Sequence, residues 1–200
     1  GAGYDTNKDG TGVATPDSMG RGIFIVDATT GALVWSVTPA GTTATNLQEA
    51  GLEHSVAGTL SPLDSNADEL TDRIYFGDTG GNIWRVDLPG NELPTSSVQP
   101  WRIVKLAAMN GGTVATDRRF FNGPDIVRTS YGGRVFDAVL IGSGDRTNPK
   151  ATDVGNQFYM IRDEQVAPYF TDRPGGMDPE CTADPVEDFR CTLPLLPGAL

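Results

Sequence analysis

The sequence is poor in the side chains on which most enzyme active sites depend. It holds a single histidine, His54, and two cysteines, Cys181 and Cys191, among 200 residues. It contains no phosphate-binding P-loop, no Gly-x-Ser-x-Gly elbow and no paired-histidine zinc motif. His54 stands between Glu53 and Ser55, but a catalytic triad requires members that meet in space, which adjacency in sequence does not provide. We therefore predict that the chain is not an enzyme.

Positive charge is scarce as well. Lys and Arg number 15 against 26 Asp and Glu, which gives a formal net charge of -11. Nucleic-acid binding rests on clustered Lys and Arg that contact phosphates, so we predict no nucleic-acid partner. No apolar run approaches the roughly 20 residues that cross a bilayer, so we predict no transmembrane segment. The chain begins at Gly1 without an initiator Met, and we interpret it as part of a longer protein.

The two cysteines lie in a tail rich in Pro and Asp. A pair of cysteines cannot by itself complete a zinc site, which needs four ligands. We interpret Cys181 and Cys191 as a local disulfide, which would contribute about 2–3 kcal/mol by constraining the unfolded chain. Such a bond implies an oxidising compartment. The alternative is a pair of reduced thiols.

Glycine and proline are abundant, and strand-forming residues come in short runs. The 25 glycines and 14 prolines suit an all-β protein with many turns. Three segments repeat one pattern, in which an apolar strand, a polar turn rich in Gly and a second strand with an aromatic residue follow one another. They span residues 22–37, 73–88 and 138–163, the last with a longer loop. Each segment is predicted to form a β-hairpin.

Hairpins repeated at this spacing favour the blades of a β-propeller. Three hairpins give about three blades, whereas a closed propeller has at least four. We therefore predict an all-β fold in which residues 1–163 form part of a larger ring, with residues 164–200 as a Pro-rich tail. The stretch from Thr38 to Thr45 is expected to connect two blades. The alternative fold is a β-sandwich.

The most specific chemical signal is an acidic loop before the second hairpin. Asp64, Asn66, Asp68 and Asp72 occupy its first, third, fifth and ninth positions, and Leu70 stands at the seventh. Calcium loops use side-chain oxygens at the first, third, fifth and ninth positions and a backbone carbonyl at the seventh. We predict that these four side chains and the Leu70 carbonyl bind Ca²⁺. The alternative is a solvated acidic turn.

Two departures separate this loop from the helix-flanked calcium loop. Glu69 replaces the Gly usual at the sixth position, where the backbone often turns left-handed, and Tyr75 stands where a bidentate Glu closes the site. We therefore expect a compact loop that leads into a strand. A weaker form of the spacing occurs at Asp5, Asn7 and Asp9. A second ion and an Asx-rich turn remain the two interpretations there.

Several of these segments resemble one known family. The acidic loop with residues 73–88, the hairpin 23–35, the segment 124–127 and the Gly-Asp-Arg-x-Asn-Pro segment within 141–149 look like the C-terminal β-propeller of the PilY/PilC-type type IV pilus tip-associated adhesins. The similarity spans roughly residues 3–163. The tail beyond residue 163 matches nothing in that family.

The resemblance implies a calcium-binding propeller domain that regulates pilus extension against retraction and supports surface attachment. Its expected partners are minor pilins and host or abiotic surfaces. Its expected location is the bacterial cell surface or pilus tip, reached through the periplasm and outer membrane. Two alternatives are a propeller fragment of a quinone-cofactor dehydrogenase and a scaffold propeller of outer-membrane assembly. The dehydrogenases carry adjacent cysteines, which Cys181 and Cys191 are not.

Overall fold

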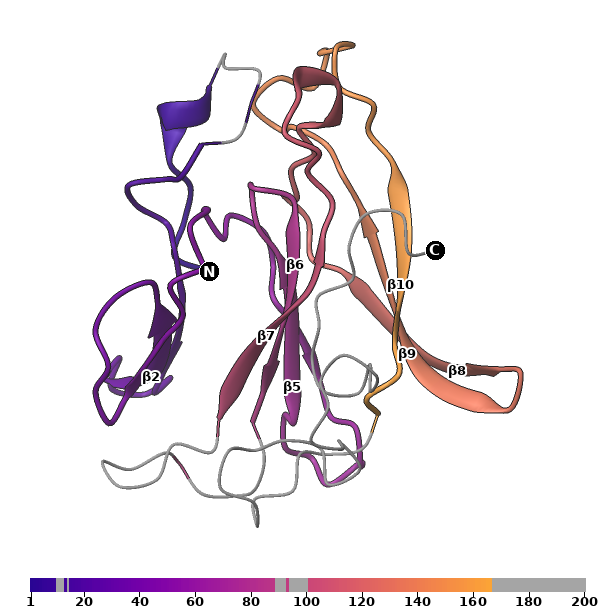
Figure 1. Cartoon of the computed structure of the whole chain (residues 1–200). Coiled ribbons are helices and arrows are strands. Elements are labelled where there is room, and N and C mark those ends of the chain that lie inside the picture. The colour runs from indigo at the N-terminus through magenta and orange to yellow at the C-terminus, as the bar shows by residue number, and fades with distance from the viewer. Residues whose placement is uncertain (10–12, 14, 89–92, 94–100, 167–200) are drawn as a thin grey trace, which may run out of the picture.

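The computed structural model describes residues 1–9, 13, 15–88, 93 and 101–166 (Figure 1). The elements in this part are short strands and two 3-10 turns. In chain order they are η1 (Thr6–Lys8), β1 (Ile23–Val26), β2 (Leu33–Thr38), β3 (Asn46–Gln48), β4 (Ser61–Leu63), β5 (Arg73–Gly77), β6 (Asn82–Asp87), β7 (Arg102–Ala108), η2 (Val114–Thr116), β8 (Asp125–Tyr131), β9 (Arg134–Gly142) and β10 (Phe158–Asp163). No helix within these ranges is long and apolar enough to span a membrane.

The strands form three separate sheets. The first has the order β1-β2-β3, the second β4-β5-β6-β7 and the third β10-β9-β8. Neighbouring strands are antiparallel, apart from the parallel pair β2 and β3. The predicted all-β fold with propeller-like blades is confirmed, as are the three hairpins, which are β1–β2, β5–β6 and β9–β10. A single two-sheet sandwich does not describe it.

One predicted connection is wrong. The stretch from Thr38 to Thr45 links β2 to β3 inside the first sheet, where Ser36 pairs with Asn46. The segment folds back because Asn46 accepts hydrogen bonds from the hydroxyls of Ser36 and Thr38 at 2.8 and 3.0 Å. These contacts join residues on either side of the turn. The composition of the turn itself does not indicate them. Beyond residue 166, the predicted tail lies outside the described residues, and so do Cys181 and Cys191.

Aspartate side chains close the first two hairpin turns. Asp78 is buried, and one of its oxygens accepts from the amides of Gly80 and Asn82 at 2.9 and 3.0 Å. Its other oxygen accepts from the indole N–H of Trp84 at 2.7 Å, which fixes the second strand to the turn. In the first hairpin, the exposed Asp27 accepts from the amides of two turn residues, at 2.9 and 2.7 Å. The repeated Asp is therefore a turn-closing residue.

The second sheet lies between the other two, as Figure 1 shows, and its two central strands are buried along their whole length. Because side chains alternate along a strand, the first and third sheets pack against different side chains of the second sheet. The core toward the first sheet is apolar and consists of Ile23, Trp35, Val37, Leu52, Val56, Ile74, Phe76, Trp84, Val86, Leu88 and Trp101. The core toward the third sheet consists of Tyr75, Ile83, Ala107, Met109, Phe120, Val139, Ile141 and Ile161. Between the second and third sheets, buried charged side chains such as Arg73, Arg85 and Asp137 lie beside this core.

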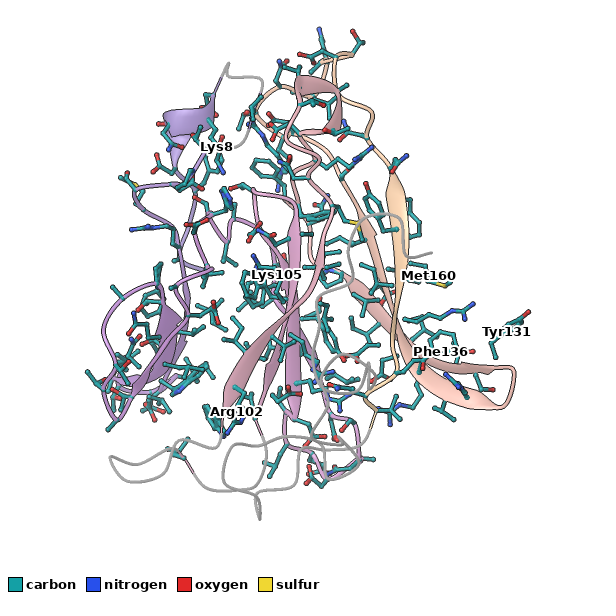
Figure 2. The ribbon with its side chains drawn as sticks, viewed as in Figure 1. Lys8, Arg102, Lys105, Tyr131, Phe136 and Met160 are labelled. Atoms are coloured by element: carbon teal, nitrogen blue, oxygen red, sulfur yellow. The ribbon has the colours of Figure 1, made fainter. Side chains whose placement is uncertain are left out.

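Tyr131, Phe158 and Met160 of the third sheet are exposed, whereas Phe136 is buried. The guanidinium of Arg162 lies 5.1 Å from the Tyr131 ring centre and 5.2 Å from that of Phe136. Figure 2 shows Tyr131 and Met160 on the side of this sheet that is away from the second sheet. Along β10 the exposed side chains of Phe158, Met160 and Arg162 therefore alternate with side chains that face the second sheet.

Candidate functional site

The predicted calcium loop connects β4 to β5 at one edge of the second sheet. Asp72 anchors its end, because the Asp72 amide donates to the Leu63 carbonyl at 2.9 Å and the Asp72 carbonyl accepts from the Leu88 amide at 2.7 Å. The next residue, Arg73, begins β5 and is buried. The loop is thus an exposed turn whose last residue is held in the sheet.

Asp64 organises the loop. Its Oδ1 accepts from the amides of Asn66, Ala67 and Asp68 at 3.2, 2.6 and 3.3 Å, and its Oδ2 accepts from the Glu69 amide at 2.9 Å. Partial desolvation by itself raises the pKa of Asp64, but these four amides stabilise the carboxylate and lower its pKa below the usual 3.8. The chain is therefore wrapped around an ionised carboxylate.

Asn66 and Asp68 lie beside each other within this turn. The Asn66 amide nitrogen donates to Asp68 Oδ2 at 3.2 Å, and the Asp68 backbone amide donates to Asn66 Oδ1 at 2.9 Å. The Leu70 amide donates to Asp68 Oδ1 at 2.9 Å, while the Leu70 side chain is exposed. The structure thus brings Asp64, Asn66 and Asp68 together through direct hydrogen bonds within the loop.

The backbone turns left-handed twice inside the loop. Ala67 has a φ of 64° and Glu69 a φ of 71°, and no other non-glycine residue in the described ranges has a positive φ. Glu69 is the sixth position, where calcium loops carry Gly. The residue departs from that pattern, but the backbone conformation does not. Such a conformation costs a non-glycine residue about 1–2 kcal/mol, and the hydrogen bonds to Asp64 hold it in place.

Asp72 is directed to another partner. Its Oδ2 accepts from both the amide and the hydroxyl of Ser65, each at 2.6 Å. Ser65 therefore lies between the fourth predicted ligand and the turn that holds the other three. This link closes the loop across its base.

The residues present fit a hard cation by their chemistry. They offer three carboxylates, one amide oxygen and a backbone carbonyl, which are the donors that Ca²⁺ prefers. Asp64 Oδ2 and Asp68 Oδ1 each accept one amide hydrogen and keep a further lone pair. Within the described part of the chain, no group of three or more His, Cys, Asp or Glu side chains converges in a ready-made metal geometry, because these carboxylates face the amides of their own loop. Calcium binding stays a prediction.

Charged side chains from β5 and β6 join the second sheet to the third sheet. Arg73 donates to Asp137 at 3.0 Å, and Arg85 donates to both oxygens of Asp163 at 2.8 and 2.7 Å. Asp87 lies 3.3 Å from Arg73 and 3.0 Å from Arg85. All five side chains are buried. Removing one member of such a network is costly, because the remaining charge is left in a low dielectric.

One contact to the acidic loop was not predicted from the sequence. Arg128 on β8 donates to both oxygens of Asp137, at 2.8 and 3.1 Å, and to the Ser65 carbonyl at 2.9 Å. It thereby connects the acidic loop to the charged interface. Ser65 and Arg128 are 63 positions apart, and no local pattern in the sequence relates them.

The weaker acidic repeat near the N-terminus forms a different structure. Asp5 accepts from the Asn7 amide at 3.0 Å and, through its other oxygen, from the amide and hydroxyl of Ser18 at 2.7 Å each. Lys8 is buried and lies 3.0 Å from Asp17, at the opposite end of the molecule from Arg102 in Figure 2. The Asp5 carboxylate thus closes an Asx turn with Asn7, and the Lys8 ammonium is directed to Asp17.

His54 lies beside the same ion pair. Its Nδ1 is 3.3 Å from Lys8 Nζ, and Lys8 also donates to the hydroxyl of Thr79 at 2.7 Å. Burial lowers the pKa of His54, and it lowers the pKa of Lys8 as well. The hydroxyl of neighbouring Ser55 donates to the Met19 carbonyl at 3.1 Å. The cluster therefore attaches the N-terminal segment to the second hairpin turn.

The Gly-Asp-Arg-x-Asn-Pro segment borders a cavity of about 300 Å³. Arg119 lines it and is fixed by Asp117 at 2.7 Å and by Asp145 at 3.1 Å. Arg119 also donates to the Lys8 carbonyl at 3.3 Å. This segment therefore helps to hold the N-terminal turn against the third sheet.

Comparisons with known proteins relate the fold to a solved structure. The chain is similar to the crystal structure of the Pseudomonas aeruginosa PilY1 C-terminal domain, with a TM-score of 0.52 and 22% sequence identity. The match covers 72% of this chain and 31% of that one, so the chain corresponds to about a third of that structure. No protein-family model matches the chain, and a search of curated proteins returned no match. The likeness supports a fold of the PilY1 C-terminal type.

Proposed function

We propose that this chain is a calcium-binding part of a PilY/PilC-type propeller, in a protein of type IV pilus biogenesis and tip adhesion. The observation that carries the proposal is the fold likeness to the PilY1 C-terminal domain over 72% of the chain. The sequence resemblance at the acidic loop and its hairpin supports the same assignment. Pilus components as partners, and a cell-surface or pilus-tip location, belong to this proposal.

Asp64, Asn66, Asp68, Asp72 and the Leu70 carbonyl would hold the ion. Bound Ca²⁺ would supply positive charge that offsets the mutual repulsion of the three carboxylates. Asp64 already fixes the turn through four amides, and Asp72 fixes its end to the sheet. The chain's own contribution is therefore to present its oxygens on a turn that is attached to β5. Binding to the folded form would stabilise that form by mass action.

Isothermal titration with Ca²⁺ tests the metal assignment. We expect binding to the wild-type chain and a large loss of affinity in Asp68→Ala, because this substitution removes a ligand at the centre of the turn. Glu53→Ala is the matched control, since it removes one exposed carboxylate outside the loop. Absence of heat and of a melting shift in the wild type would end the calcium assignment.

The pilus assignment is tested by counting pili on the source bacterium. We expect deletion of the gene to reduce surface pili counted by electron microscopy, and the wild-type gene to restore them. A strain that carries Asp68→Ala is expected to show altered pilus number at equal protein level. Unchanged piliation in the deletion strain would reject the pilus role.

A further inference from the structure

Arg128 makes contacts in two parts of the molecule at once. Its Nε and Nη2 donate to the two oxygens of Asp137 at 2.8 and 3.1 Å, and its Nη1 donates to the Ser65 carbonyl at 2.9 Å. Asp137 is fully buried at the interface of the second and third sheets. The planar guanidinium suits this arrangement, because it presents several donors in a fixed geometry.

Ser65 transmits this contact to the predicted ligand Asp72. The amide and hydroxyl of Ser65 both donate to Asp72 Oδ2 at 2.6 Å, while its carbonyl accepts from Arg128. A shift of Asp72 therefore moves Ser65, and a shift of Ser65 changes the distance to Arg128.

Asp137 is reached from the other end of the loop as well. Arg73 follows Asp72 in the chain, and its Nη1 donates to Asp137 Oδ2 at 3.0 Å. The start of the loop, through Ser65 and Arg128, and its end, through Arg73, thus meet at one buried carboxylate. This gives the loop two attachments to the third sheet.

We propose that Arg128 is a positioning residue that couples the Asp64–Asp72 loop to the interface of the second and third sheets. The part of this inference that concerns Ca²⁺ rests on the proposed function. The structural coupling itself does not require the ion. The position of β8 and β9 and the geometry of the loop then change together.

If Arg128 acted only through its charge, its removal would change the Ca²⁺ affinity in the opposite direction. If the residue acted only as a positive charge near a cation site, Arg128→Gln would bind Ca²⁺ more tightly and Arg128→Lys would equal the wild type. If it positions Ser65, both substitutions weaken binding, because neither side chain can hold Asp137 and Ser65 together. The two variants therefore separate charge from geometry.

Calcium titration of the full chain gives the first test. We expect about fivefold weaker binding in both Arg128→Lys and Arg128→Gln, as for loss of one hydrogen bond. Arg134→Gln is the control, since this arginine lies on the neighbouring strand, is 67% exposed and pairs with Glu164. Wild-type affinity in Arg128→Lys together with tighter binding in Arg128→Gln would overturn the proposal.

A double-mutant cycle without calcium gives the second test. The urea midpoints of Asp72→Asn, Arg128→Gln and the double variant are compared with the wild type in the presence of a chelator. We expect the double variant to lose less than the sum of the two single losses, because both act through Ser65. Additive losses would overturn the coupling. If the cycle shows coupling but the wild type binds no Ca²⁺, the calcium function is rejected. The structural coupling proposed here is then still supported.

Discussion

Asp163→Asn is expected to destabilise the protein strongly. Asp163 is 4% exposed and accepts two contacts from Arg85, at 2.8 and 2.7 Å, and one from the Tyr75 hydroxyl at 2.9 Å. Removing one member of a buried ion pair typically costs about 3–5 kcal/mol. Arg85 keeps Asp87 at 3.0 Å, so we expect the low end of that range, about 3 kcal/mol.

Urea unfolding followed by tryptophan fluorescence measures this loss. With a slope of about 2 kcal/mol/M, a loss of about 3 kcal/mol lowers the midpoint by roughly 1.5 M. Glu164→Gln is the control at the next residue, because its partner Arg134 is largely exposed, and we expect a change below about 0.5 kcal/mol. A loss below about 1 kcal/mol in Asp163→Asn would show that Asp87 alone satisfies Arg85 and refute the reasoning.

Two further predictions concern the hairpin turns and the N-terminal turn. Gly31→Ala is expected to cost about 1–2 kcal/mol, because Gly31 has a φ of 72° in open space. Gly81→Ala is expected to cost more, since Gly81 has a φ of 80° and its added Cβ would lie 2.6 Å from the Arg118 carbonyl; equal melting temperatures would contradict this. Hydrogen bonds from the Ser18 hydroxyl and amide lower the pKa of Asp5 from 3.8 to about 2. Asp5 therefore stabilises the fold above pH 3.8, and this contribution disappears as the pH falls through about 2. The gap in urea midpoint between wild type and Asp5→Asn should close over that range, and a gap that stays constant would exclude the effect.

The hairpins were predictable because their signals are local. Asp27 and Asp78 precede their turns directly, and the residues that they bond lie within a few positions. The acidic loop was predictable for the same reason, and even the unexpected Glu69 adopts the left-handed backbone of the usual Gly. Short-range chemistry determines these elements.

The charged interface was not predictable from local patterns. Arg73 and Asp137 are 64 positions apart, and Arg85 and Asp163 are 78 apart. Alternation along β5 and β6 indicates which side chains share a face, but it does not say which neighbouring sheet covers that face. The role of Arg128 depends on the same long-range packing, and so does the return of β3 beside β2.

The buried carboxylates of the third sheet have a consequence for how the molecule folds. Asp137 and Asp163 stand directly opposite each other on β9 and β10, and like charges in such a pair destabilise a hairpin. Arg73 and Arg85 of the second sheet supply the charge that this pair lacks. The third hairpin is therefore expected to assemble only on a finished second one, which gives the blades a fixed order of formation. Hydrogen exchange should accordingly show β9 and β10 losing protection no later than β5 and β6.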